Sequence, residues 1–167
     1  MSQAPDFHYT PIDICKKLLE DINFVEGDTT LEPCKGRGLG NFYQLIPYEK
    51  DWAEVDENPP RDIFTYDFGR LFNKCIVNPP YKCNAELKED RKNIAMKFIF
   101  RCLELCSDEC WVLLNLQMLN SLTPIRLKKI EEMGFGIVFM RIINIPKWFG
   151  RYYWICFKKD SPSMIKY

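Results

Sequence analysis

The sequence predicts an α/β fold with an open, mostly parallel seven-stranded sheet, helices on both faces and an antiparallel strand near the C-terminus. Strand and helix patterns alternate along most of the chain, which is typical of a parallel sheet covered on both faces. Residues 111–116 form a nearly continuous apolar run, as a strand buried on both faces does. Only residues 144–151 separate the last two strand patterns. So short a link predicts an antiparallel pair, because a parallel crossover needs about a dozen residues or more.

Two helices and four strands are expected in the first half of the chain. A hydroxyl N-cap followed by proline, Thr10-Pro11, starts the first helix, and apolar residues then recur at helical spacing until it ends near Gly27. A glycine-rich turn at residues 36–40 separates the first strand from a helix that begins at Asn41. The four strands are residues 30–32, 52–56, 62–66 and 74–77.

The second half of the chain completes the alternation. Residues 82–91 are polar and charged, so we expect a loop there, and residues 93–106 have a helical period. The buried strand at 111–116 is followed by an amphipathic helix at 124–133. The last two strands are rich in β-branched and aromatic residues and comprise residues 136–143 and 152–158.

Composition indicates one globular domain, residues 1–167, with 47% hydrophobic and 28% charged residues, enough to bury a core. No run of about 18 apolar residues occurs, and residues 1–11 contain no apolar stretch of a secretory signal. We therefore expect an intracellular protein, cytoplasmic or nuclear, without a membrane contact. The 23 basic and 23 acidic side chains leave no net charge, which argues against tight binding of nucleic acid through phosphates alone.

The eight cysteines are expected to be buried, reduced thiols. Cys102, Cys106 and Cys110 recur every four residues, which would place them along one stripe of a helix. The sequence has no Cys-x-x-Cys pair, and the sole histidine, His8, lies far from these cysteines. We therefore expect no metal site.

Acidic residues and glycines follow three successive strands of the first half. Glu32 ends the first strand and could bind an ammonium group, and the turn that Pro33 opens contains Gly36 and Gly38, where the backbone can approach a ligand closely. Glu54 follows 22 residues after Glu32, a spacing that suits the two hydroxyls of a ribose. Asp67 and Phe68 offer an acceptor for an adenine amino group and an apolar edge for its ring. The series predicts a nucleoside cofactor.

The candidate chemistry lies in Asn78, Pro79, Pro80 and Tyr81, directly after a buried strand. Two successive prolines fix an extended, rigid turn, so a backbone carbonyl and the Asn78 side-chain oxygen can both point into the site as acceptors. Two acceptors that grip the hydrogens of a conjugated NH₂ group favour pyramidal nitrogen and free its lone pair for attack on a methyl group. Tyr81 supplies a face on which a planar substrate can stack.

With these motifs the chain resembles the class I S-adenosylmethionine-dependent methyltransferases, in particular the gamma group of adenine-N6 DNA methyltransferases that carry Asn-Pro-Pro-Tyr. The resemblance covers roughly residues 8–158. It implies a Rossmann-like methyltransferase fold with S-adenosyl-L-methionine as cofactor. By this resemblance Tyr9, Thr10 and Glu32 face the methionine part, Glu54 the ribose, and Asp67 and Phe68 the adenine. Asn78, Pro79 and Tyr81 hold the target amine.

The expected reaction is methylation of adenine N6 in nucleic acid, with DNA favoured over RNA. Trp148 and Phe149 are candidates for a second aromatic wall around a flipped base. Six basic residues could contact the phosphates of a nucleic acid, namely Lys82, Lys88, Arg91, Lys92, Lys147 and Arg151. No span after Lys159 remains for a target-recognition region, so a protein partner could supply recognition. Two alternatives stay open, namely methylation of a protein glutamine amide and an inert methyltransferase-fold subunit that binds a partner.

Overall fold

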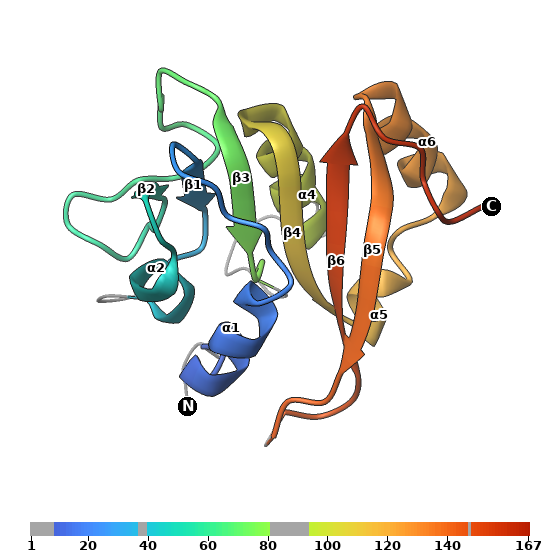
Figure 1. The fold of residues 1–167 in the computed structure, drawn as a ribbon, viewed down its shortest axis with the longest axis horizontal. Helices are drawn as coiled ribbons and strands as arrows, with labels where there is room; N and C mark the ends of the chain where they lie inside the picture. Colours follow the sequence, from blue (N-terminus) through green and yellow to red (C-terminus); the bar gives the residue numbers. More distant parts are fainter. Residues whose placement is uncertain (1–8, 37–39, 81–93, 147) are drawn as a thin grey trace, which may run out of the picture.

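In this computed structural model, which describes residues 9–36, 40–80, 94–146 and 148–167, six strands form one sheet. The strand order is β2-β1-β3-β4-β6-β5 (Figure 1). The four strands β2, β1, β3 and β4 are parallel, and β6 runs antiparallel to both β4 and β5. The antiparallel end of the sheet is therefore confirmed. The strands are β1 (Thr29–Glu32), β2 (Glu49–Trp52), β3 (Phe72–Val77), β4 (Cys106–Asn115), β5 (Phe135–Ile143) and β6 (Tyr152–Lys159).

The expected seventh strand, residues 62–66, is a turn in the structure. The Asp62 carboxylate accepts a hydrogen bond from the Phe64 amide at 2.9 Å, and the Asp62 carbonyl accepts one from the Tyr66 amide at 2.7 Å. An aspartate that binds the backbone two residues ahead offers the chain a turn in place of a strand ladder. The second strand also ends earlier than expected, at Trp52. Beyond it, Ala53 forms backbone hydrogen bonds with Glu32 and Lys35, and Glu54 forms an isolated antiparallel bridge with Arg61.

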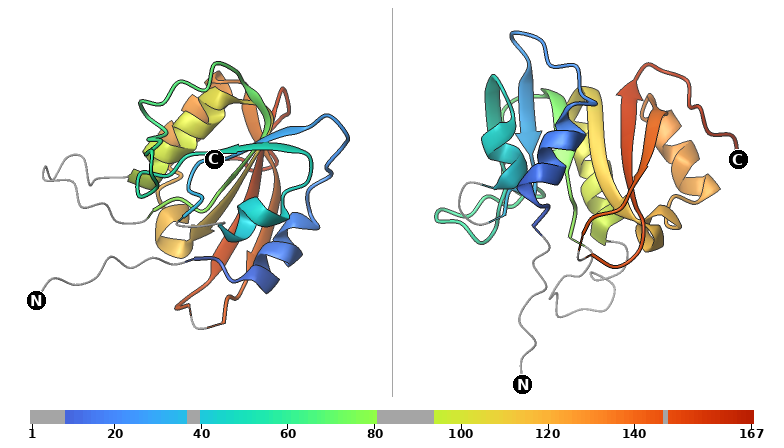
Figure 2. Two further views of the ribbon diagram at one scale, coloured as in Figure 1. Left: turned by 90° about the vertical axis from the view of Figure 1, so that its left-hand side faces the viewer. Right: turned by 60° about the horizontal axis from the view of Figure 1, so that its bottom comes forward.

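Helices cover both faces of the sheet, as expected (Figure 2). On one face lie α1 (Ile12–Leu19) and α2 (Asn41–Leu45), and on the other lie α4 (Ile94–Leu105), α5 (Leu116–Leu119) and α6 (Pro124–Glu132). The helix α1 ends at Leu19, well before Gly27, and buries Ile14, Cys15 and Leu18 against the sheet. Within the described residues, no helix combines the length and the apolar character needed to cross a bilayer.

The cysteine spacing does not mark a single helix. Cys102 belongs to α4, whereas Cys106 begins β4 and Cys110 lies inside it, because the chain passes directly from helix to strand at that point. All three thiols are buried in the core between the sheet and α4. The seven cysteines in the described part of the chain are free.

The strand order places a topological switch point between β1 and β3. From β1 the chain adds β2 on one side of the sheet and then crosses to build β3 and β4 on the other side. Crevices form at such points outside the carboxyl ends of the strands, and ligands bind there in open α/β sheets. The connection between β5 and β6 projects beyond this same edge, which lies at the bottom of Figure 1. We call this edge, where β1, β3, β4 and β5 end, the carboxyl edge.

The opposite half of the sheet is held by a buried ion network centred on Lys74 of β3, which is 3% exposed. Its ammonium lies 3.5 Å from a carboxylate oxygen of Asp28, 3.5 Å from one of Glu109 and 3.7 Å from one of Asp108. Burial opposes the ionisation of Glu109, but hydrogen bonds from Lys158 and Trp111 outweigh it and lower the pKa of this carboxyl group. One lysine thus compensates carboxylates from segments that are far apart in the sequence.

Replacement of Lys74 by methionine should lower the free energy of unfolding by about 3–5 kcal/mol, because it leaves the buried carboxylate of Asp28 without its cation, whereas Glu109 and Asp108 keep Lys158. Urea unfolding at pH 7 measures the effect, with Lys166→Met, at an exposed lysine, as the control. The difference from the wild type should shrink as the pH falls through the lowered pKa of Glu109, because protonated carboxyl groups no longer need the ammonium. A loss below about 1 kcal/mol would show that the network contributes no more than a surface ion pair.

Candidate functional site

Asn78 lies at the carboxyl edge, immediately after β3. Its Nδ2 donates a hydrogen bond to the Thr10 hydroxyl oxygen at 3.1 Å. Thr10 is 4% exposed, and its backbone carbonyl accepts a hydrogen bond from Asn41 Nδ2 at 2.7 Å. Pro79 is buried and Pro80 is half-buried, which fits the rigid turn expected after the strand. Three segments that are far apart in the sequence therefore meet at Thr10.

Glu32, the last residue of β1, is a buried carboxyl group at the neighbouring strand end. It is 3% exposed, and its Oε2 has no hydrogen-bond partner among the described residues. Burial raises the pKa of Glu32 well above its usual value, although the Tyr43 backbone amide and the Lys35 ammonium act in the opposite direction. A buried acceptor without a partner is costly for the folded chain, and a cationic donor that binds there would satisfy it.

The glycine turn brings Tyr9, Gly36 and Glu54 together. Gly36 has a φ of +78°, and a Cβ at this position would collide with the Tyr9 ring, so only glycine fits. The Gly36 amide donates to the Glu54 carboxylate at 2.8 Å, and the Asp56 amide donates to its other oxygen at 3.1 Å. Pro33 is buried at the start of this turn. Gly38 lies outside the described residues.

The structure does not bring Asp67 and Phe68 to the carboxyl edge. The Phe68 ring packs against the Phe72 ring, with centroids 5.7 Å apart, and Phe72 begins β3. Five residues of strand separate Phe72 from Val77, a rise of about 17 Å. Asp67 is exposed, and its carboxylate accepts a hydrogen bond from the Gly69 amide at 2.8 Å. The Phe68 ring thus packs on the first residue of β3, and its other ring contact is Tyr66, with centroids 4.8 Å apart.

Two cations flank Trp52, a residue to which the sequence assigned no role. The Lys35 ammonium lies 4.9 Å from the centre of the Trp52 ring and pairs with Glu57 at 2.8 Å. The Arg61 guanidinium lies 4.4 Å from the same ring. Lys35 is only 7% exposed, so it supports the glycine turn from within. The sequence analysis did not predict this support of the glycine turn by Lys35 and Trp52. An aromatic residue at the end of a strand, together with a lysine in the glycine turn, could have indicated it.

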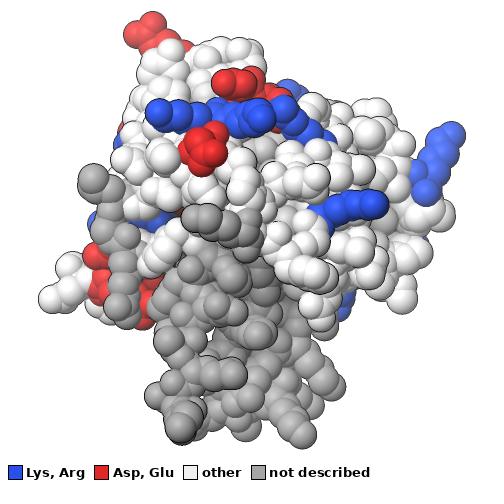
Figure 3. Space-filling model, turned by 90° about the horizontal axis from the view of Figure 1, so that it is seen from below, with Lys and Arg blue, Asp and Glu red and all other residues white. Residues whose placement is uncertain are grey.

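The aromatic pair Trp148 and Phe149 lies in the β5–β6 connection, beyond the same edge as Asn78. Phe149 is 99% exposed, whereas Trp148 is half-buried, with its ring centroid 4.9 Å from that of Tyr152. Seen from below, the described surface carries separate groups of Lys and Arg side chains, with Asp and Glu beside the largest group (Figure 3). Several expected substrate contacts lie outside the described residues, namely Tyr81, Lys82, Lys88, Arg91, Lys92 and Lys147.

The residues at the carboxyl edge fit part of a nucleoside cofactor that carries an amino acid. The Glu32 oxygen that has no partner among the described residues suits an ammonium group. Glu54 already accepts two amide hydrogen bonds, so it would hold a ribose through its remaining lone pairs. Among the described residues, no group of three or more His, Cys, Asp or Glu side chains could hold a metal ion.

The strand order and the antiparallel end of the sheet are those of the Rossmann-like methyltransferase fold. A protein from Listeria monocytogenes described as a class I S-adenosylmethionine-dependent methyltransferase superposes with a TM-score of 0.69 at 16% identity, over 94% of this chain and 62% of that one. An RNA methyltransferase, so described, from Pyrococcus horikoshii gives 0.63 at 19% identity, over 93% and 88% of the two chains. The modification subunit of a protein described as a type I restriction enzyme from Vibrio vulnificus gives 0.64 at 14% identity, over 93% and 45%.

At these identities the likeness establishes the fold. The chain spans less than two thirds of the Listeria and Vibrio proteins. No family model and no curated protein matches the sequence.

Replacement of Glu32 by glutamine should stabilise the protein in the absence of cofactor, by roughly 1–3 kcal/mol at pH 8, because the amide has no charge to desolvate. The raised pKa of Glu32 means that the penalty of its ionisation is absent at low pH and grows as the pH rises above about 4.3, the unfolded-state value. The gain should therefore vanish near pH 4.

Urea unfolding of both proteins from pH 4 to pH 8 measures this dependence. Glu54→Gln is the matched control, because the Glu54 carboxylate already accepts two backbone hydrogen bonds and its replacement should bring no gain. A Glu32→Gln protein that is less stable than the wild type at pH 8 would contradict this account of the buried carboxyl group.

Proposed function

We propose that the chain is an S-adenosylmethionine-dependent methyltransferase that modifies the exocyclic N6 amine of adenine in DNA or RNA. The observation that carries the proposal is the pairing of two features at one switch point. A buried carboxyl group with an unpartnered oxygen, Glu32, ends β1, and the rigid Asn78-Pro79-Pro80 turn follows the adjacent strand β3. The first feature suits the ammonium of the cofactor, and the second suits a flat NH₂ group.

In this proposal some residues at the switch point bind the cofactor and others bind the substrate amine. Glu32 and the turn at Gly36 hold the amino-acid part of the cofactor, and Glu54 holds the ribose. The cofactor supplies an electrophilic methyl group. Asn78 Oδ1 and a backbone carbonyl of the turn accept the two hydrogens of the substrate amine, which favours pyramidal nitrogen. With its lone pair freed in this way, the nitrogen would accept the methyl group that the cofactor supplies and would release its proton to water.

Nucleic acid is supported as the substrate by the shape of the edge and by the similar structures. Phe149 and Trp148 lie in the β5–β6 connection, beyond the same edge as the catalytic turn, and the exposed Phe149 ring offers a face on which an extruded base could stack. The similar structures include a protein described as an RNA methyltransferase and a modification subunit of a restriction enzyme. The chain has no net charge, so a partner that supplies target recognition is part of this proposal. The adenine-binding roles of Asp67 and Phe68 would require the segment before β3 to rearrange.

Incubation with labelled S-adenosylmethionine and, separately, duplex DNA, single-stranded DNA, RNA and protein extract tests the proposal. Digestion of the labelled product to nucleosides should give N6-methyladenosine or its deoxy form. Asn78→Ala should reduce the rate by about 100-fold or more, because it removes an acceptor aimed at the reacting amine. Asn144→Ala is the control, since this exposed asparagine follows β5 at the same edge.

The other outcomes are equally informative. Label in glutamine would replace nucleic acid by protein as the substrate. An Asn78→Ala protein with full activity would contradict the role of the catalytic turn. Calorimetry with S-adenosylmethionine distinguishes an enzyme from an inert subunit, because a subunit that has lost the site should show no binding and Glu32→Ala should then change nothing.

A further inference from the structure

We propose that Thr10 is a positioning residue whose hydroxyl sets the orientation of the Asn78 amide. The inference rests on the methyl transfer proposed above and gives Thr10 a role toward Asn78 rather than toward the cofactor. Its starting point is the hydrogen bond from Asn78 Nδ2 to the Thr10 hydroxyl oxygen, 3.1 Å long. It joins the N-terminal segment to the catalytic turn, 68 residues further along the chain.

The orientation of the amide decides whether Asn78 can serve the reaction. A substrate NH₂ group brings hydrogens, so it needs the Oδ1 acceptor, and an exposed Nδ2 would repel it. Oxygen and nitrogen lie on opposite sides of the same planar group. When Thr10 holds Nδ2, Oδ1 is turned away from Thr10. In the structure the Thr10 hydroxyl is the acceptor, and this bond holds the amide in the one of two nearly isosteric orientations that leaves Oδ1 turned away from Thr10.

Thr10 is itself held in place, as a positioning residue must be. It is 4% exposed. Its backbone carbonyl accepts hydrogen bonds from Asn41 Nδ2 at 2.7 Å and from the Cys15 thiol at 3.5 Å. Pro11 follows with a φ of −56°, and the Cys15 amide donates to the Pro11 carbonyl at 2.9 Å, which fixes the entry into α1. Rotation of the Thr10 backbone would break contacts on both sides.

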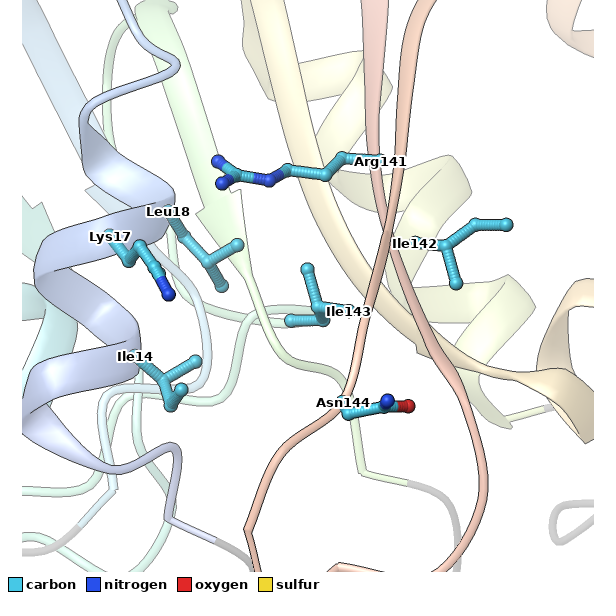
Figure 4. Close-up of a pocket in the computed structure, with 7 residues that line it drawn as sticks. All are labelled: Ile14, Lys17, Leu18, Arg141, Ile142, Ile143 and Asn144. Carbon is cyan, nitrogen blue, oxygen red and sulfur yellow. The ribbon is translucent and has the colours of Figure 1, made fainter.

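The helix that follows Thr10 is fastened to the sheet. Ile14 and Leu18 project from α1 toward β5, and Arg141 reaches from β5 toward the helix (Figure 4). The Arg141 guanidinium binds both carboxylate oxygens of Asp21 at 3.0 and 2.9 Å. Both bonds come from the Arg141 Nη1 atom, and this ion pair ties the residues just after α1 to β5. The segment that carries Thr10 is thus connected both to Asn78 and to β5, the strand at the far edge of the sheet.

Asn41 adds a connection to the cofactor side. It begins α2 directly after Gly40, at the end of the glycine turn. Its bond to the Thr10 carbonyl and the bond of Asn78 to the Thr10 hydroxyl attach both turns to one residue. The relative position of cofactor and substrate amine would depend on this common anchor, and small errors there reduce rates strongly.

The test compares Thr10→Val, which removes the hydroxyl at nearly constant shape, with Thr10→Ser, which retains it. Thr10→Val should lower kcat by roughly 10- to 100-fold, the effect of misplacing a reacting group by a fraction of an ångström to 1 Å. The Kd of S-adenosylmethionine, from calorimetry, should stay within about twofold of the wild type. Thr10→Ser should recover most of kcat. Thr123→Val, at an exposed threonine before α6, is the control.

A second measurement, on the wild-type protein, does not depend on enzymatic activity. In the cofactor-free wild-type protein, hydrogen exchange of the Asn78 side-chain amide, followed by NMR, should be slower than that of the exposed Asn144 side chain, because one Nδ2 proton is held by Thr10. In Thr10→Val, where it folds, the Asn78 exchange should be faster than in the wild type.

Three results would overturn the inference. The first is unprotected exchange at Asn78 in the wild type. The second is a Thr10→Val enzyme with unchanged kcat, or a Thr10→Ser enzyme as impaired as Thr10→Val. The third is a weakened Kd for S-adenosylmethionine with unchanged kcat, which would assign the hydroxyl to the cofactor. If the wild type methylates nothing, the proposed function fails, whereas the exchange measurement still decides the contact between Thr10 and Asn78.

Discussion

The adjacency of β1 and β3 at the switch point is the constraint on which the site depends. Because the two strands are parallel neighbours, the residues that follow them leave the sheet side by side. Glu32 and Asn78 are 46 positions apart in the printed sequence, yet they share one edge. The remaining structure at this edge, from the first helix to the glycine turn, holds these two strand ends in a fixed relation.

Two polar residues of the site, Glu32 and Thr10, are removed from solvent. Glu32 and Thr10 are almost fully buried, so each polar group there needs a specific partner. Thr10 and Glu54 have theirs within the chain. Glu32 retains an oxygen that has none among the described residues, at a cost to the folded state. Such a cost persists in a protein when a ligand relieves it.

Much of the fold follows from local sequence patterns. The run at 111–116 and the short link at 144–151 were enough to predict a buried central strand and an antiparallel end, because both depend on residues close in sequence. The strand expected at 62–66 was wrong, because Asp62 binds the backbone ahead of it and forms a turn. The cysteine spacing was misleading for a similar reason, since the chain changes from helix to strand at Cys106.

The site residues that lie at the ends of strands could be predicted from the sequence. Those that lie in the connections between strands could not be placed as well. Glu32, Gly36 and Asn78 follow strands that the pattern identified, and they meet at one edge. Asp67 and Phe68 were expected at this edge because of the strand assigned before them. Without that strand the chain returns toward the start of β3, and Phe68 packs on Phe72. The contact between Asn41 and Thr10 has no sequence signature, because it links two polar residues across 31 positions.

The ion network around Lys74 has a practical consequence. Lys74 and Asn78 are four residues apart along extended backbone, about 13 Å, and the Lys74 ammonium is offset by carboxylates of Asp28, Asp108 and Glu109 at 3.5 to 3.7 Å. The charges that hold the sheet together therefore act on the reacting groups only weakly. The ion network and the proposed reacting groups thus lie at different positions along β3. Replacement of the whole network by apolar residues could raise the thermal stability of the protein with little effect on the electrostatics of the reaction.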